Sequence, residues 1–73
     1  MSKLPQASGA EVVKTLEKAG FSVRRQQGSH IILRRDDPFA QTVVPNHRQI
    51  DRGTLRAILR QTGLSVEEFV KLL

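Results

Sequence analysis

The chain contains no cysteine, no tryptophan and no tyrosine, and it has only three phenylalanines. Without cysteine it has no disulfide framework, no thiol nucleophile and no thiolate zinc site. The shortage of aromatic side chains disfavours a base-stacking platform of the kind found in RNA-recognition motifs and OB-folds. No apolar run is long enough to span a bilayer and no signal-peptide pattern is visible, so we expect a soluble cytoplasmic protein.

The length of 73 residues corresponds to one small domain, which we expect to span 1–73 with a loose tail at 1–6. The 38% of hydrophobic residues is enough for one thin core. Twelve Lys and Arg against seven Asp and Glu give a net charge of +5. That excess of positive charge favours an anionic partner.

The positive charge is concentrated in the middle of the chain. The charges nearly cancel in 1–20 and in 61–73, whereas 21–60 carries eight basic residues against three aspartates. All eight are arginine, whose planar guanidinium can bind phosphate oxygens in pairs. They are Arg24, Arg25, Arg34, Arg35, Arg48, Arg52, Arg56 and Arg60. This segregation favours a phosphate-binding surface, and a solvated basic face is the alternative.

The first expected helix lies near the start of the chain. Ser8 and Glu11 are spaced as a capping box, in which each side chain accepts a hydrogen bond from the other residue's backbone amide. The apolar residues that follow recur every three or four positions, and Gly20 is placed to end the helix in a left-handed conformation. The pattern predicts a helix over 9–19.

Two further helices are expected near the end of the chain. Asp51 can cap the first of them, and Gly63 can terminate it. Leucine and isoleucine between these two residues are spaced as one inner stripe. A second capping box over 65–68 predicts that the last helix begins there.

Three strands are expected between the first two helices. Alternating apolar and polar residues flank the dipeptide Gly28-Ser29, which has the composition of a hairpin turn. A later strand is stopped by Pro45. The expected strands are 21–27, 30–35 and 41–44. The order α-β-β-β-α-α predicts an α+β fold, in which a three-stranded antiparallel sheet has helices on one face. This layout resembles that of a double-stranded-RNA-binding domain.

The two histidines, His30 and His47, are the candidates for chemistry. Imidazole titrates near pH 6.5, so it can take the proton of a ribose 2′-hydroxyl and return one to a leaving 5′-oxygen. Arginines would neutralise the phosphorane, and such RNA cleavage needs no cofactor. The histidines lie 17 residues apart with no carboxylate at a ligand spacing, so we expect no metal site.

The neighbours of each histidine suggest its role. His30 follows the Gly28-Ser29 turn, where a side chain can be exposed and rigidly held, and an ordinary exposed histidine is the alternative. His47 lies in the loop before the second helix, either as a second acid/base or as a residue that fixes the loop. The arginines expected to bind RNA phosphates are Arg24, Arg34, Arg52, Arg56 and Arg60. The last three recur every fourth residue, which places them along one face of the second helix.

The ordered set of these segments resembles the HicA-type toxins of bacterial toxin–antitoxin systems. The matching residues are Ser8-Gly9, Gly20-Phe21, Gly28-Ser29-His30, Val44-Pro45, His47, Gly53-Thr54-Leu55 and the run from Ile58 to Phe69. The resemblance covers about residues 4–73. Many relatives carry a histidine or an aromatic residue directly after the Gly-Ser-His motif, where this sequence has Ile31 and Ile32.

The resemblance implies a function and two partners. It implies a double-stranded-RNA-binding-like fold and mRNA interferase activity, with His30 as the catalytic residue and Gly28 and Ser29 as its supporting motif. The substrate would be mRNA, and a HicB-type antitoxin would cover the active face. A non-catalytic RNA-binding module of the same fold is the main alternative. A small domain whose basic face docks an acidic protein is another.

Overall fold

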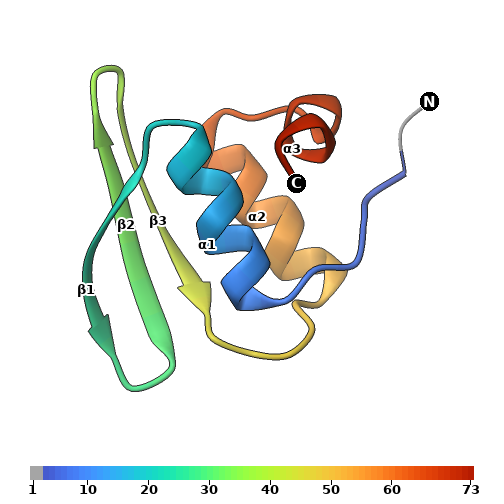
Figure 1. Cartoon of the computed structure of the whole chain (residues 1–73), viewed down its shortest axis with the longest axis horizontal. Helices are drawn as coiled ribbons and strands as arrows, with labels where there is room; N and C mark the ends of the chain where they lie inside the picture. Colours follow the sequence, from blue (N-terminus) through green and yellow to red (C-terminus); the bar gives the residue numbers. More distant parts are fainter. Residues whose placement is uncertain (1–2) are drawn as a thin grey trace.

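The computed structural model describes residues 3–73 as a two-layer α+β fold (Figure 1). Its elements are α1 (Gly9–Lys18), β1 (Ser22–Gln27), β2 (His30–Asp36), β3 (Phe39–Pro45), α2 (Arg52–Thr62) and α3 (Val66–Leu72). The order and type of every element confirm the sequence prediction, and each boundary differs by two residues at most. No helix within residues 3–73 is long and apolar enough to cross a bilayer.

The helices begin at the residues that the capping signals indicate. The Ser8 amide donates to Glu11 Oε1 at 2.8 Å, and the Glu11 amide donates back to Ser8 Oγ at 3.1 Å. The same pair of bonds closes the capping box of α3. Asp51 caps α2 by accepting from the backbone amide and the hydroxyl of Thr54, at 3.0 and 2.7 Å. These caps satisfy amides that would otherwise have no partner within the helix.

The sheet has the order β1-β2-β3, and both pairs of neighbouring strands are antiparallel. In the central strand β2, Ile31 and Leu33 are buried under the helices. Because side chains alternate along a strand, His30, Ile32 and Arg34 lie on the opposite side. We call this side, which the helices leave uncovered, the open face of the sheet.

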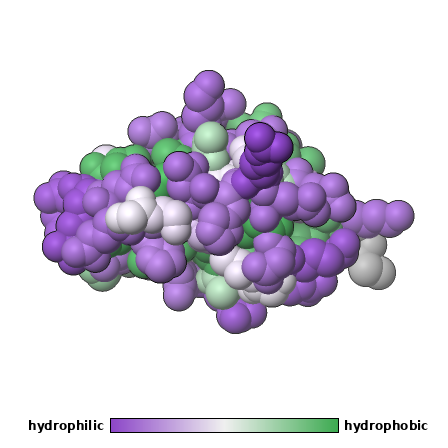
Figure 2. Space-filling view, turned by 90° about the horizontal axis from the view of Figure 1, so that it is seen from below, coloured by the Kyte–Doolittle hydropathy of each residue, from purple (hydrophilic) through white to green (hydrophobic). Residues whose placement is uncertain are grey.

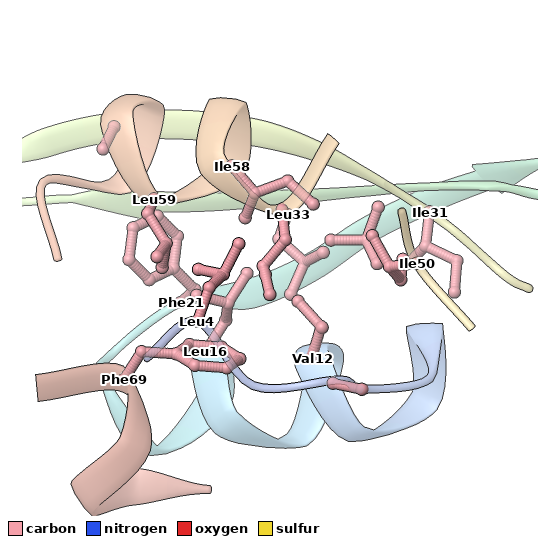
Figure 3. Close-up of a cluster of buried hydrophobic side chains, with 14 residues drawn as sticks. Leu4, Val12, Leu16, Phe21, Ile31, Leu33, Ile50, Ile58, Leu59 and Phe69 are labelled. Atoms are coloured by element: carbon pink, nitrogen blue, oxygen red, sulfur yellow. The ribbon is translucent and has the colours of Figure 1, made fainter. Parts of the chain in front are cut away.

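The core lies between the sheet and the helical layer. Figure 3 shows side chains of α1 and α2 converging on Leu33 of the sheet, with Phe69 of α3 beside Leu16. The largest fully buried side chains among the apolar residues are Phe69, Leu16, Leu33, Leu55, Ile58, Val12 and Val44. Helices α1 and α2 therefore pack directly on the sheet, and α3 packs against α1.

The expectation of a loose tail over 1–6 is wrong at Leu4. Its side chain is only 8% exposed and belongs to the core (Figure 3). The Ile50 amide donates to the Ala7 carbonyl at 2.8 Å, so this segment is also attached through its backbone. Burying a leucine side chain contributes about 1.5–3 kcal/mol, which offsets part of the cost of ordering this segment. Residues 1 and 2 of the expected tail lie outside the described part of the chain.

Candidate active site

His30 is the first residue of β2 and follows directly on the turn at Gly28 and Ser29. Gly28 has a φ of +56°, a conformation that residues with a side chain rarely adopt. In the strand register, His30 lies opposite Gln27 of β1 and Pro45 of β3. The His30 side chain is exposed on the open face. A histidine held on the central strand in this way is accessible and has a fixed backbone.

The loop between β3 and α2 brings His47 to the same end of the sheet. The Asn46 amide donates to the Ser29 carbonyl at 2.6 Å, and the Gly9 amide donates to the His47 carbonyl at 2.8 Å. His47 is therefore tied by its backbone between α1 and the β1–β2 turn, while its side chain is exposed. Figure 2 views the molecule from this end, and hydrophilic residues cover most of it.

Arginines of β1 share the open face with His30. Arg25 lies opposite Ile32 of β2, which places it on this face two residue pairs along the strands from His30. Arg24 is the extra residue of a β-bulge, so Arg24 and Arg25 together oppose Ile32. Val23 lies opposite the buried Leu33, so it is on the helix side of the sheet. Because side chains alternate along a strand, the next residue, Arg24, is on the open face as well. Sequence reasoning selected Arg24 and passed over Arg25, because a bulge has no signal in the sequence.

Arg34 lies farther along the open face and has a carboxylate beside it. Its Nε is 2.9 Å from Oδ1 of Asp36, and its side chain is 34% exposed. The contact does not have hydrogen-bond geometry, and this buried Nε has no other partner. Ion pairs of this kind near the surface contribute little to stability. The remaining guanidinium nitrogens of Arg34 are therefore the part of this side chain that can contact a phosphate.

The other expected phosphate-binding residues lie in the helical layer. Arg52, Arg56 and Arg60 are exposed along α2. Arg56 and Arg60 line a groove of about 520 Å³ between α2 and α3, whose apolar lining includes Leu64. The structure thus separates these three arginines from the open face, and only Arg52, at the start of α2, lies next to the His47 loop.

The N-termini of α1 and α2 also lie at the histidine end (Figure 1). Helix N-termini attract anions, but here carboxylates of the chain already occupy both. Glu11 is bound in the capping box of α1, and Asp51 accepts two hydrogen bonds at α2. The Thr54 hydroxyl, followed by the Thr54 amide, lowers the pKa of Asp51 below its ordinary value. A phosphate at this end would therefore have to be bound by arginine side chains rather than by a helix N-terminus.

Within residues 3–73 no group of three His, Asp or Glu side chains is placed to hold a metal ion. On the open face, the carboxylate of Asp36 lies beside Arg34. The titratable side chains that are exposed at this end include the imidazoles of His30 and His47.

Residues 9–64 match the family model described as the HicA toxin of bacterial toxin–antitoxin. This range covers more than half of the 73 residues. The chain belongs to the HicA toxin family. The match confirms the resemblance seen in the sequence, and it spans both histidines and all eight arginines of the basic segment. Among the curated proteins, no sequence matches the chain.

Membership of the HicA family makes this protein a toxin of a toxin–antitoxin pair, and such a toxin has an antitoxin as its partner. The HicA match runs from the first residue of α1 to just past α2. Helix α3 follows the matched range, and its Phe69 completes the core.

Proposed function

We propose that this HicA-family toxin is a metal-independent endoribonuclease that cleaves mRNA, with His30 as general acid/base. The observation that carries the proposal is the exposed imidazole on the central strand, with Arg25 on the same face. A base for RNA cleavage must reach a ribose hydroxyl while a cation contacts the adjacent phosphate. The placement of His30 and Arg25 on one face of two hydrogen-bonded strands supports this division of roles.

The proposed reaction needs only the 2′-hydroxyl of RNA and these side chains. His30 takes the 2′-hydroxyl proton, and the 2′-oxygen forms a new bond to phosphorus. The bond from phosphorus to the 5′-oxygen of the next nucleotide breaks, and a protonated imidazole supplies that oxygen with its proton. The products are a 2′,3′-cyclic phosphate and a free 5′-hydroxyl. His47, at the same end of the sheet, is the proposed second acid/base.

The arginines on the open face are proposed to bind the phosphates next to the cleaved bond. Arg24 and Arg25 lie on β1 and Arg34 lies on β2, the strand that carries His30, and their charge neutralises the phosphorane. Arg52, Arg56 and Arg60 extend the positive surface along α2, where they contact RNA farther from the reacting phosphate. Binding of mRNA by such contacts falls steeply as salt concentration rises.

The antitoxin partner is proposed to be a HicB-type protein that covers His30 with carboxylates in place of phosphates. Opposite charges on the two proteins would speed their association, and burial of the site would slow dissociation. Hydrogen-exchange mapping of the complex tests this mode of inhibition. Protection of residues 28–35 is expected, and a complex that leaves them unprotected contradicts direct coverage of the site.

The deciding experiment compares the wild type with His30→Ala, using growth without antitoxin and digestion of RNA in EDTA. The exposed His30 is outside the core, so we expect a change in unfolding free energy within about 0.5 kcal/mol. Loss of a general base lowers the cleavage rate by about 10²–10⁴. The variant should therefore fold and bind RNA and antitoxin without inhibiting growth.

The variant His47→Ala is the matched control at the second histidine. If both imidazoles act, each substitution removes one limb of the pH–rate profile. Full toxicity of a folded His30→Ala protein contradicts the mechanism. It would instead support a non-catalytic RNA-binding module in which His30 is a contact residue.

A further inference from the structure

Helix α1 begins against the loop that carries His47, and Gly9 is the residue at the contact. Gly9 is the first residue of α1 and is buried. A Cβ atom at this position would overlap the carbonyl oxygen of Pro45 and would lie 2.9 Å from Asn46 Cα. Both are backbone atoms, so neither can rotate away as a flexible side chain does. Glycine is required here because the two backbones approach too closely for any side chain.

The loop that touches Gly9 also touches the His30 turn. Pro45 lies opposite His30 in the sheet register, and the Asn46 amide donates to the Ser29 carbonyl at 2.6 Å. On its other side the loop accepts a hydrogen bond of 2.8 Å from the Gly9 amide. A shift of the loop away from α1 therefore moves His47 and strains the backbone contacts that hold His30.

We propose that Gly9 is a positioning residue of the candidate active site. Its missing side chain lets α1 hold residues 45–47 against the His30 turn, which fixes the two imidazoles relative to each other. Gly9 acts only through the backbone of Pro45 and His47. The inference rests on the proposed function, because it assumes that His30 reacts. Catalysis is sensitive to such placement, and a displacement of about 1 Å can cost about 10²-fold in rate.

A second glycine in a first helical turn provides the matched control. Gly53 lies in the first turn of α2, at the same end of the molecule, and is exposed. A Cβ atom there would meet only Oδ2 of Asp51, at 3.4 Å. Gly53→Ala adds the same methyl group without displacing the loop. Any effect of Gly9→Ala that Gly53→Ala lacks is therefore due to the loop contact.

The experiment compares Gly9→Ala and Gly53→Ala in the full chain. It measures far-UV circular dichroism, kcat and KM for an oligoribonucleotide, and the imidazole C–H NMR signals. We expect Gly9→Ala to keep the helical spectrum and to lower kcat by at least about tenfold. KM should change by less than about threefold, because the open-face arginines are unaltered. The imidazole signals of His30 and His47 should shift, and Gly53→Ala should leave all four readouts unchanged.

Several results would overturn the inference. A folded Gly9→Ala with the kcat and imidazole signals of the wild type would do so, and so would a loss confined to KM. If Gly9→Ala does not fold, amide hydrogen exchange of the wild type decides. Slow exchange of the Gly9 and Asn46 amides supports the fixed loop, and exchange at the rate of an unstructured chain refutes it. A wild type that cleaves no RNA contradicts the proposed function, whereas the imidazole signals still test the positioning by Gly9.

Discussion

The guanidinium carbon of Arg35 lies 4.6 Å from the centre of the Phe21 ring, in a cation–π contact. Its Nε donates to the Pro38 carbonyl at 3.0 Å, and Nη2 donates to the Thr62 carbonyl at 3.4 Å. Arg35 thus joins the β2–β3 turn to the last turn of α2, whose carbonyls carry partial negative charge. These contacts give Arg35 a structural role.

Neighbouring arginines of β2 should therefore respond differently to substitution. Arg35→Ala removes the cation–π contact and two hydrogen bonds, so we expect a loss of about 1–2 kcal/mol of unfolding free energy. Arg34→Ala removes only the contact with Asp36, so a loss within about 0.5 kcal/mol is expected, together with weaker RNA binding. Urea denaturation and an RNA-binding assay check both. Equal destabilisation by the two variants would contradict the assignment of Arg35 to the fold.

The two arginine surfaces can be separated by salt dependence. We plot the logarithm of the affinity for single-stranded RNA against the logarithm of the salt concentration. The double variant Arg25→Ala/Arg34→Ala should reduce the steepness of the slope of this plot by about 1.4, because two phosphate contacts are lost. It should also lower kcat, because these residues lie on the face of His30.

The matched double variant on α2 is Arg56→Ala/Arg60→Ala. It should flatten the same plot and leave kcat unchanged, because these side chains lie in the helical layer. An unchanged slope would show that the α2 arginines face something other than RNA.

The sequence contains enough information for the elements of this fold but not for all of its contacts. Capping boxes, turn glycines and alternation are local signals, so α1, the hairpin at Gly28 and the burial of Leu55 in α2 follow from them. Alternation alone does not decide which face of β2 is buried, because Ile32 is as apolar as Ile31. The register with β3, where Ile31 lies opposite the buried Val44, decides it.

The parts of the site that sequence reasoning missed depend on contacts between distant segments. The bulge that brings Arg25 beside Ile32 arises from strand pairing, and pairing is a property of two segments together. In the sequence, Gly9 is an ordinary residue at the start of a helix. The backbone that it contacts is 36 residues away at Pro45, so the local sequence gives no sign of this contact. Leu4 likewise has no periodic neighbours, and only the assembled core buries it.

Stability should depend strongly on α3, although this helix lies outside the HicA match. Phe69 is fully buried, and truncating a buried phenylalanine to alanine costs about 3–5 kcal/mol. That is a large part of the stability of a small domain. Thermal unfolding of Phe69→Ala should show a greatly lowered Tm. Val70→Ala is the control, because Val70 is 44% exposed and should change stability by about 0.5 kcal/mol or less. Similar Tm values for the two variants would contradict a core role for α3.

The cap of α2 should make stability depend on pH in the acidic range. Hydrogen bonds from the Thr54 hydroxyl and amide lower the pKa of Asp51 below its ordinary value in the folded protein. The folded state therefore binds this proton less readily than the unfolded chain. The stabilisation is fully present above the unfolded pKa and is lost as the pH falls through the folded pKa.

Two substitutions of Asp51 separate the contribution of its capping hydrogen bonds from that of its negative charge. Asp51→Ala should lower the urea midpoint at pH 6 relative to the wild type, and the difference should shrink below about pH 4. Asp51→Ser keeps an oxygen acceptor without a titrating group, so it should recover most of the midpoint at pH 6. Its midpoint should also decline less steeply with acid than that of the wild type. If Asp51→Ser and the wild type lose stability in parallel from pH 6 to pH 3, the acid dependence comes from other carboxylates. Glu68 is then the next to test, because hydrogen bonds from the Ser65 amide and hydroxyl lower its pKa in the same way.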